Sequence, residues 1–363
     1  MRFPMNNPQT PSESNTSLTT EAGEVSAEEA LRIASTYFGI EARSVKRLIS
    51  ERDHNFLLRS ECGAFVLKIA HPAEERLLSN LQSEALLHVE ARDPGLHVQR
   101  VIRGLNGNAE LALEFDGQVR IVRMVSYLEG TLLRHAPVSL AQQRNLGIEL
   151  ARLSVALRDF EHPGADHVLL WDIQHAEGLR PMFDVFDPLR RPWMEETLDI
   201  FVNQVKPVLA RLRKQVVHND LNSDNALVRP DAPEQIAGIL DFGDMVRTAL
   251  INDVVVAVAY ALGDGDTLLE APRAFLEGYQ SVTPLTDEEV DVFYDLLMVR
   301  MVLRLTLTEW RAARFPENSE YILRNTPRTW TQFEQLRSMS RIEVEQGLFG
   351  ERPVTASAIE WRA

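Results

Sequence analysis

The spacing of apolar residues changes near residue 130, and this change limits the folds open to the chain more than any other feature. Between residues 44 and 69, short apolar runs alternate with polar segments, a pattern that predicts three antiparallel strands. Residues 73–92 have helical spacing, and the runs at 98–102 and 119–127 predict two further strands. Helical spacing dominates the rest of the chain. The sequence therefore predicts an α+β protein with a small N-terminal lobe built on an antiparallel sheet and a larger, mainly helical C-terminal lobe.

The same pattern divides the chain into three segments. Residues 1–24 are rich in Ser, Thr, Asn and Pro, which predicts a disordered tail. Order begins at Ser26, the N-cap of the first predicted helix. We expect the N-terminal lobe at residues 25–125 and the C-terminal lobe at residues 126–363, with a hinge at about 126–131.

Composition and charge limit the possible partners. The chain has 363 residues and a formal net charge of -15, which opposes binding to nucleic acid or to an anionic membrane and favours a small cationic molecule. Cys62 is the single cysteine, so an internal disulfide and a cysteine-based zinc site are both excluded. The first residues lack the features of a secretory signal, and the longest apolar run, at residues 254–262, is far shorter than the ~20 residues of a membrane span. We expect a cytoplasmic protein, and the oligomeric state stays open.

A cluster of polar residues between two apolar stretches carries the chemistry. His218, Asp220 and Asn225 have the spacing H-x-D-x-x-x-x-N, and Asp241 follows in the sequence DFGD. Phosphoryl transfer needs a carboxylate near the acceptor hydroxyl and oxygen ligands for Mg²⁺. We expect Asp220 to be the catalytic residue that accepts or orients the proton, and Asn225 and Asp241 to hold the metal.

The segment from Asn225 to Asp241 also has a structural interpretation. Two short apolar runs flank the turn PDAPE, which predicts a hairpin with Asn225 at the start of one strand and Asp241 at the end of the other. Antiparallel pairing would bring the two predicted metal ligands side by side. An Asn/Asp-rich loop is also common as ordinary turn chemistry, and we expect His218 to support the loop rather than to act as a base.

The cation for the phosphates is expected in the N-terminal lobe. Lys68 ends a predicted strand, and Glu84 on the following helix is its predicted partner. The loop SERDHNF at residues 50–56 would cover the phosphates; it has no glycine, so donors from Ser50 and Asn55 would replace a glycine-rich loop.

The connector between the lobes is the predicted site for the nucleotide base. The carbonyl of Ser126 and the amide of Leu128 are the groups that we expect to bond the base of ATP or GTP, and the sequence does not distinguish the two nucleotides. An ordinary interlobe connection is the alternative interpretation.

Several segments carry a resemblance to a known family. VVHNDLNSDNALV and GILDFGD resemble the aminoglycoside phosphotransferase and choline kinase family. Within this family, further segments are similar to the hydroxylysine kinase group and to the phosphotransferase domains fused to class III aminotransferases: SERDHNF, LLWDIQHA and RFPENSEYIL, at residues 50–56, 169–176 and 314–323.

The resemblance implies a two-lobed protein-kinase-like fold that binds a nucleotide. It implies a base at Asp220, metal ligands at Asn225 and Asp241, and contact between Lys68 and the phosphates. It also implies that Asp253 braces the catalytic loop.

Two positions depart from the pattern of the family. Asn219 stands where the family usually has Gly, and His54 stands where it usually has Gln. Asn is the best replacement for Gly in a left-handed backbone conformation, and no catalytic position is lost.

The acceptor of a kinase with this resemblance would be a small cationic hydroxylated amine or amino acid. Asp244 is the nearest spare acid for an ammonium group, and Trp171 and Asp172 begin a segment that would line the same pocket. The substrate's own carboxylate would need a cation. Charged residues of the long helix near the C-terminus are candidates for the facing wall, although they are equally well ordinary surface charges: Arg300, Arg304 and Glu309.

The function that these features favour is a small-molecule kinase. It would transfer the γ-phosphoryl group of a nucleoside triphosphate to the hydroxyl of an amino alcohol, 5-hydroxylysine first among them. The alternatives are an aminoglycoside or homoserine kinase on the same scaffold, or a nucleotide-binding pseudokinase without activity.

Overall fold

Residues 23–48, 50 and 53–351 are described by the computed structural model, in which the chain forms two units. The first unit comprises the described residues up to Ser83 and the segment Arg100–Tyr127, and the second comprises Glu84–Gln99 and the described residues from Leu128 onward. The predicted disordered tail lies outside the described residues except for Gly23 and Glu24. The predicted lobe boundaries stay a prediction.

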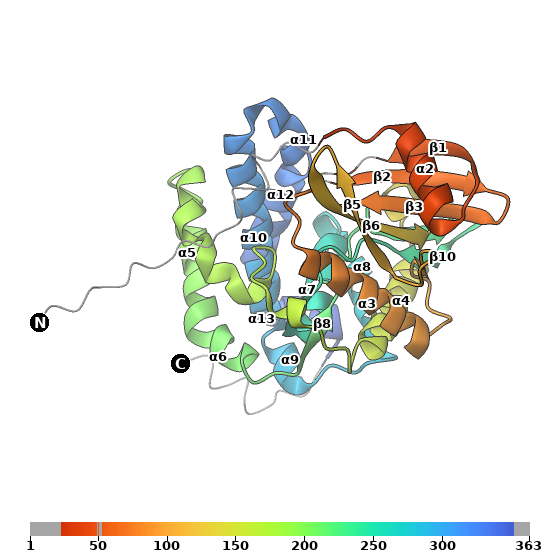
Figure 1. Ribbon diagram of the computed structural model, residues 1–363. Helices are drawn as coiled ribbons and strands as arrows, with labels where there is room; N and C mark the ends of the chain where they lie inside the picture. The colour runs from red at the N-terminus through yellow and green to blue at the C-terminus, as the bar shows by residue number, and fades with distance from the viewer. Residues whose placement is uncertain (1–22, 49, 51–52, 352–363) are drawn as a thin grey trace, which may run out of the picture. The chain divides into compact units, whose positions relative to one another are not determined.

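The first unit is built on a six-stranded antiparallel sheet (Figure 1). Its strand order is β1-β2-β3-β6-β4, and β5 also pairs with β6. The strands are β1 (Ala42–Leu48), β2 (His54–Ser60), β3 (Gly63–Ile69), β4 (Val101–Ile102), β5 (Glu110–Phe115) and β6 (Gln118–Ser126). The α+β fold class and the three strands predicted between residues 44 and 69 are confirmed.

The sequence analysis did not predict β5. This strand pairs with β6 through a two-residue turn, in which Asp116 has φ 47° and Gly117 has φ 79°. Positive φ at both turn residues is typical of a type I′ hairpin, for which Asp-Gly is a strong signal. The Asp-Gly pair and the alternation of apolar and other residues in ELALEF before it are the signals in the sequence that indicate this strand.

Helix α2 (Ala27–Phe38) completes the core of the first unit. The side chain of Ser26 accepts a hydrogen bond from the amide of Glu29, as predicted for this N-cap. The buried face of the helix, including Ile33 and Phe38, packs against apolar side chains of the sheet, among them Leu58 and Leu67. Burial of this apolar surface holds the helix on the sheet.

The second unit is mainly helical. Helix α3 (Arg76–Arg92) runs into it from the first unit. Its longer helices are α4 (Leu140–Ala156), η3 (Ile173–Val185), α5 (Arg191–Ile200), α7 (Leu250–Ala261), α8 (Glu270–Gln280), α10 (Phe293–Arg314), α12 (Thr326–Ser338) and α13 (Arg341–Phe349). Shorter helices include η1 (Leu133–His135), η4 (Phe201–Val205), α6 (Lys206–Leu209) and α11 (Ser319–Leu323). No helix in the described part of the chain is long and apolar enough to cross a membrane.

One predicted helix is divided in the structure. Thr286 and Glu289 form a capping box, a pattern that can be read in the sequence, but the helix that they open, α9 (Asp287–Asp291), is short. Helix α10 begins separately at Phe293, after Val292, which lies between the two helices with φ -98° and ψ -2°. The sequence pattern could not show this break, since the apolar spacing continues through it.

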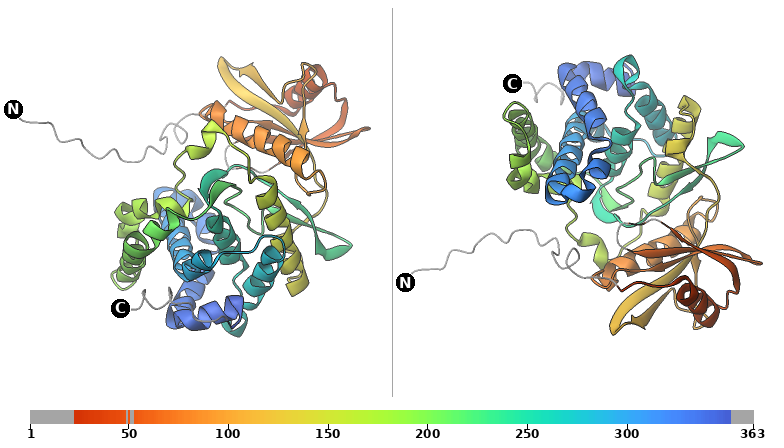
Figure 2. Two further views of the ribbon diagram at one scale, coloured as in Figure 1. Left: turned by 90° about the horizontal axis from the view of Figure 1, so that it is seen from below. Right: turned by 90° about the horizontal axis from the view of Figure 1, so that it is seen from above.

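Two small sheets in the second unit position the candidate site. Strand β8 (Lys214–Val217) pairs antiparallel with β11 (Val246–Ala249). Strands β9 (Ala226–Arg229) and β10 (Ala232–Ile239) form the predicted hairpin, and β7 (Thr131–Leu132) pairs with β9. The hairpin, green in Figure 2, lies beside α4.

Candidate active site

The loop between β8 and β9 contains the predicted catalytic residue. His218 is buried, its Nε2 lies 2.9 Å from the carbonyl oxygen of Leu240, and its ring packs edge-on against Phe242. Burial lowers the pKa of the His218 imidazole, which favours the neutral ring. The geometry agrees with the prediction that His218 supports the loop, because it ties the loop to the end of β10.

Asp253 holds the next residue of the same loop. Its Oδ1 accepts a hydrogen bond of 2.7 Å from the amide of Asn219, as expected for a residue that braces the catalytic loop. Asn219 has φ 63°, the left-handed conformation that Gly and Asn adopt most easily. Asn at a position where the family usually has Gly is therefore compatible with the backbone of the loop.

Two asparagine side chains hold the Asp220 carboxylate. Asn222 donates to its Oδ1 at 3.0 Å, and Asn225 donates to its Oδ2 at 2.7 Å. The pKa of Asp220 is raised to about 7, first by burial and then by the negative charge of Asp244, while the charge of Arg300 opposes this shift. A fixed carboxylate that titrates near neutral pH is suited to accept a proton from an acceptor hydroxyl.

Asn222 was not singled out by the sequence analysis. Its side chain also accepts a hydrogen bond from the Asp224 amide at 2.7 Å, so it organises both sides of the loop. The available signal was the Asp-x-Asn spacing, since Asn side chains commonly bond backbone groups two residues away.

Asn225 and Asp241 lie at neighbouring positions of the β9–β10 hairpin. The Leu240 amide donates to the Asn225 carbonyl at 2.8 Å, which places Asp241 next to Asn225. The side-chain nitrogen of Asn225 is bound to Asp220, and so its Oδ1 is the atom left for a metal ion. Asp241 is exposed, with one oxygen accepting from the Gly243 amide at 3.1 Å.

The donor set fits a hard divalent cation. Amide and carboxylate oxygens are ligands that Mg²⁺ prefers, with water and phosphate oxygens completing the shell. No group of three or more His, Cys, Asp or Glu side chains that could hold a metal ion occurs among the described residues. The chain would thus hold such an ion jointly with a phosphorylated ligand.

Of the predicted substrate residues, Asp172 differs from the expectation. It is fully buried, and its carboxylate accepts hydrogen bonds from Thr248 at 3.0 Å and from the Gln174 amide at 3.1 Å, which caps η3. A carboxylate enclosed in this way does not face a ligand, so we withdraw Asp172 from the substrate group. Burial could not be read from the spacing of LLWDIQHA.

Trp171 and Asp244 are both partly exposed. The Trp171 carbonyl accepts a hydrogen bond of 2.7 Å from Arg300, whose guanidinium lies 5.4 Å from the centre of the Trp171 ring. Asp244 is close enough to Asp220 for its charge to raise the pKa of that carboxyl. Their contact with a substrate stays a prediction.

The residues predicted to bind the nucleotide fall in both units. Lys68 pairs in the sheet between Asn55 of β2 and Arg123 of β6, while Glu84 is an exposed residue of α3 in the second unit. The Lys68–Glu84 ion pair therefore stays a prediction. The side chain of Ser50 donates to the Asp53 carbonyl.

The rest of the nucleotide site is only partly described. Glu51 and Arg52 of the predicted phosphate loop lie outside the described residues. Ser126 ends β6, and its hydroxyl accepts from the Arg100 amide at 2.8 Å. Leu128 is the first residue of the second segment of the second unit. Contact of these groups with a nucleotide base stays a prediction.

The chain has a loop carboxylate fixed by two amides, beside residues that could hold a divalent ion, in an α+β fold. This combination is typical of small-molecule kinases. The chain belongs to the phosphotransferase enzyme family, whose model matches residues 44–286. The family resemblance seen in the sequence is thereby confirmed.

Similar proteins agree with this assignment. The chain is 29% identical over 332 residues to a hydroxylysine kinase from Danio rerio, covering 87% of this chain and 93% of the relative. Among solved structures, a microcompartment-associated aminopropanol kinase matches with a TM-score of 0.69 at 16% identity, covering 90% of this chain and 100% of that one. An amicoumacin kinase in complex with AMP-PNP and Ca²⁺ matches with a TM-score of 0.63 at 17% identity, covering 86% and 97%. These structures establish the kinase-like fold.

Proposed function

We propose that this protein transfers the γ-phosphoryl group of ATP or GTP to the hydroxyl of a small cationic amino alcohol, 5-hydroxylysine first among them. The observation that carries the proposal is the Asp220 carboxylate, held by Asn222 and Asn225 with its pKa raised to about 7. The similarity to a hydroxylysine kinase along most of both chains supports the choice of acceptor.

The residues of the chain would have distinct roles. Asp220 would orient the acceptor hydroxyl and take its proton as the bond to phosphorus forms. Asn225 and Asp241 would hold Mg²⁺, which when bound neutralises charge on the transferred phosphate. Asn222 would keep the Asp220 carboxylate in one orientation, so that little reorganisation accompanies the reaction.

Three further assignments belong to this proposal. Lys68, with Glu84 as its partner, would contact the phosphates, together with Ser50 and Asn55. Ser126 and Leu128 would bond the nucleotide base. Asp244 and Trp171 would contact the acceptor. We also propose a cytoplasmic location, which the exposed, unpaired thiol of Cys62 supports.

An acceptor panel tests the proposal. The protein is incubated with Mg²⁺, with ATP or GTP, and with 5-hydroxylysine, homoserine, an aminoglycoside or an aminopropanol, and release of nucleoside diphosphate is followed. We expect saturable release with 5-hydroxylysine, and loss of that release by about 10²-fold or more in Asp220→Asn. Asp231→Asn is the matched control, because Asp231 is an exposed residue that pairs with Arg229 at the hairpin turn.

The other outcomes separate the alternatives. Saturation by homoserine or by an aminoglycoside alone would change the acceptor within the same class. Thermal stabilisation by a nucleotide, without turnover of any acceptor, would indicate a pseudokinase and contradict the proposal.

A further inference from the structure

Helix α10 carries two arginines, Arg300 and Arg304, that lie about one turn apart. Arg300 and Arg304 both lie over the ring of Tyr260, with guanidinium carbons 5.8 Å and 4.3 Å from its centre. Neither forms an ion pair with any residue in the described part of the chain. Two guanidinium groups that share one aromatic ring repel each other, and burial without an anion makes this arrangement costly.

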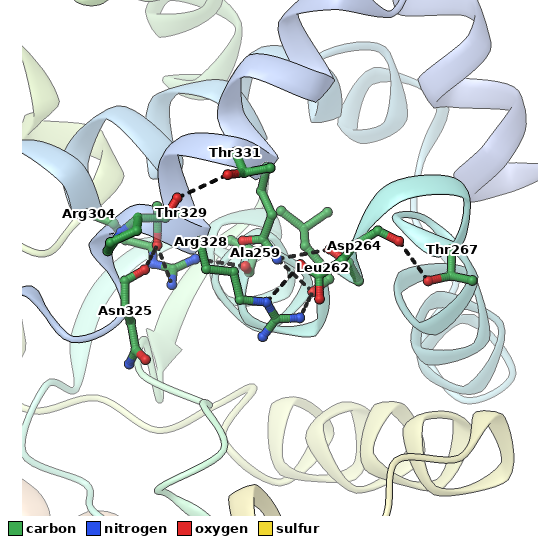
Figure 3. A network of polar contacts seen from close by, with 12 residues as sticks. Ala259, Leu262, Asp264, Thr267, Arg304, Asn325, Arg328, Thr329 and Thr331 are labelled. Atoms are coloured by element: carbon green, nitrogen blue, oxygen red, sulfur yellow. Dashed lines mark hydrogen bonds and ion pairs between the residues drawn. The ribbon is translucent and has the colours of Figure 1, made fainter.

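Neutral groups hold both side chains. Arg300 is fully buried; it donates to the Trp171 carbonyl at 2.7 Å, and its Nε is buried without a partner. Arg304 is partly exposed, donates to the Ala259 carbonyl at 2.8 Å and lies 3.4 Å from the Thr329 hydroxyl (Figure 3). These contacts orient the guanidinium groups without giving either an ion pair among the described residues, although the negative charge of Asp220 acts on both. Buried arginines held only by neutral groups are suited to bind an anionic ligand group.

A series of hydrogen bonds and strand pairs connects Arg300 to the catalytic loop. Arg300 bonds Trp171, and the next residue, Asp172, bonds Thr248 of β11. Strand β11 pairs with β8, whose last residue, Val217, is followed within three positions by Asp220. Electrostatics agree, since the charge of Arg300 lowers the pKa of Asp220 and the charge of Asp220 raises that of Arg304.

Charges of both signs interact with Asp220. Asp220 and Asp244 are acidic, and Arg300 and Arg304 are basic. A purely cationic acceptor such as an aminoglycoside complements the acidic group only. An amino acid complements both, with its ammonium group toward the acids and its carboxylate toward the arginines.

We propose that Arg300 and Arg304 form a subsite for the carboxylate of the acceptor, so that this kinase selects hydroxylated amino acids over hydroxylated amines that lack a carboxylate. The inference rests on the proposed function. Arg304, the partly exposed member, contacts the carboxylate. Arg300 is a positioning residue that adds positive charge behind Arg304 and holds the Trp171 segment.

The kinetic test compares 5-hydroxylysine with 1,5-diaminopentan-2-ol, the same molecule without its carboxylate. We expect kcat/KM to favour 5-hydroxylysine by about 10- to 100-fold, the size of a charge-assisted hydrogen bond. Arg304→Gln should remove this preference, mainly through a higher KM for 5-hydroxylysine and with a smaller effect on the diamine. Arg304→Lys should restore part of the preference. Arg300→Lys, with its melting temperature checked, should weaken the preference less than Arg304→Gln.

Arg328 provides the matched control. It lies on α12 near Arg304, and its side chain is engaged by Asp264 and the Leu262 carbonyl (Figure 3). Arg328→Gln should leave the preference as in the wild type. Equal turnover of the two acceptors by the wild type, or an equal loss for both in Arg304→Gln, would overturn the subsite.

A binding experiment separates this inference from the proposed function. Lysine and 1,5-diaminopentane have no alcohol hydroxyl and so cannot act as acceptors. Each is titrated by calorimetry into the wild type and into Arg304→Gln. If the wild type binds lysine at least 10-fold more tightly than it binds the diamine, and Arg304→Gln loses this difference, the subsite is supported even if no acceptor is turned over. Equal binding of both ligands, or binding of neither, overturns it.

Discussion

The side-chain amide of Asn225 lies 2.7 Å from Oδ2 of Asp220 and 2.9 Å from the carbonyl oxygen of the same residue. One amide therefore fixes both the backbone and the carboxylate of the proposed catalytic residue. Asp241 lies next to Asn225 in the hairpin, because the Leu240 amide donates to the Asn225 carbonyl. The proposed base and the proposed metal site consequently share one structural element.

Replacement of Asn225 by Asp should disable the enzyme without unfolding it. The change removes the donor to Asp220 and places a second negative charge beside its carboxylate, so we expect kcat to fall by about 10²- to 10⁴-fold. Steady-state kinetics with the preferred acceptor measure this loss. Asn145→Asp is the control, because Asn145 is a surface residue of α4 that bonds the Glu234 carbonyl. A variant with wild-type kcat would refute the role of Asn225.

The pH dependence of activity should report the environment of Asp220. Its pKa is raised to about 7, and only the ionised carboxylate can accept a proton, so kcat/KM should increase as the pH rises through about 7. Asp244→Asn removes a negative charge that raises this pKa. The low-pH limb of the kcat/KM profile should therefore move to lower pH. Asp264, which follows the C-terminal end of α7 and pairs with Arg328, is not among the charges that act on Asp220, so Asp264→Asn should leave the low-pH limb of the profile in place. A shift to higher pH in Asp244→Asn would contradict this electrostatic assignment.

Protein stability should decrease in acid through His218. Burial lowers the pKa of this imidazole in the folded state, so the unfolded chain binds more protons below its ordinary pKa of about 6.5. The His218 contribution to stability is therefore complete above that pH and is lost as the pH falls, with a slope of at most about 1.4 kcal/mol per pH unit.

Denaturant unfolding between pH 5 and 8 measures this slope, and His218→Gln should reduce it. Because the other titrating groups contribute equally to the slope in both proteins, the difference between the two slopes reports the His218 contribution. Exposed His135 is the matched position, where the same substitution should leave the slope unchanged. An unchanged slope in His218→Gln would show that this imidazole does not titrate on unfolding.

Packing of α4 against α8 should depend on two glycines. A Cβ atom at Gly147 would overlap the Phe275 carbonyl, and one at Gly278 would overlap the Arg144 carbonyl. Both obstacles are backbone atoms, so the helices would have to move apart, and we expect either alanine variant to lose about 1–3 kcal/mol of unfolding free energy or more. Gly178→Ala is the control, because a Cβ at that position has no neighbour within 4 Å. Equal stability of the Gly147 and control variants would contradict the close helix contact.

Much of the loop chemistry could be predicted from local sequence. The hairpin that follows Asn225, the caps at Ser26 and Thr286, and the support of the loop by His218 all depend on residues close together in the chain. Contacts between residues close in the chain can be predicted directly from residue spacing and from the residue types in turns. The family resemblance was read from the same segments.

Other features of the site could not be predicted in this way. Asp172 looked like a pocket residue, but Thr248, 76 positions later, encloses it in a hydrogen bond. Arg300 could equally have been a surface charge until its contact with Trp171, 129 positions earlier, was known. The break at Val292 is likewise invisible in the apolar pattern.

The sequence by itself determined the class of chemistry, because an aspartate, an asparagine and a DFG turn at these spacings form a local unit that folds around its own backbone hydrogen bonds. Only the tertiary structure decided how each carboxylate is charged and which cations lie unpaired. Burial and electrostatic fields depend on residues that come together across the whole unit, as Asp220, Asp244 and Arg300 do. For this reason the reaction class could be read from the chain, whereas the proposed preference for an amino acid acceptor became visible only in the fold.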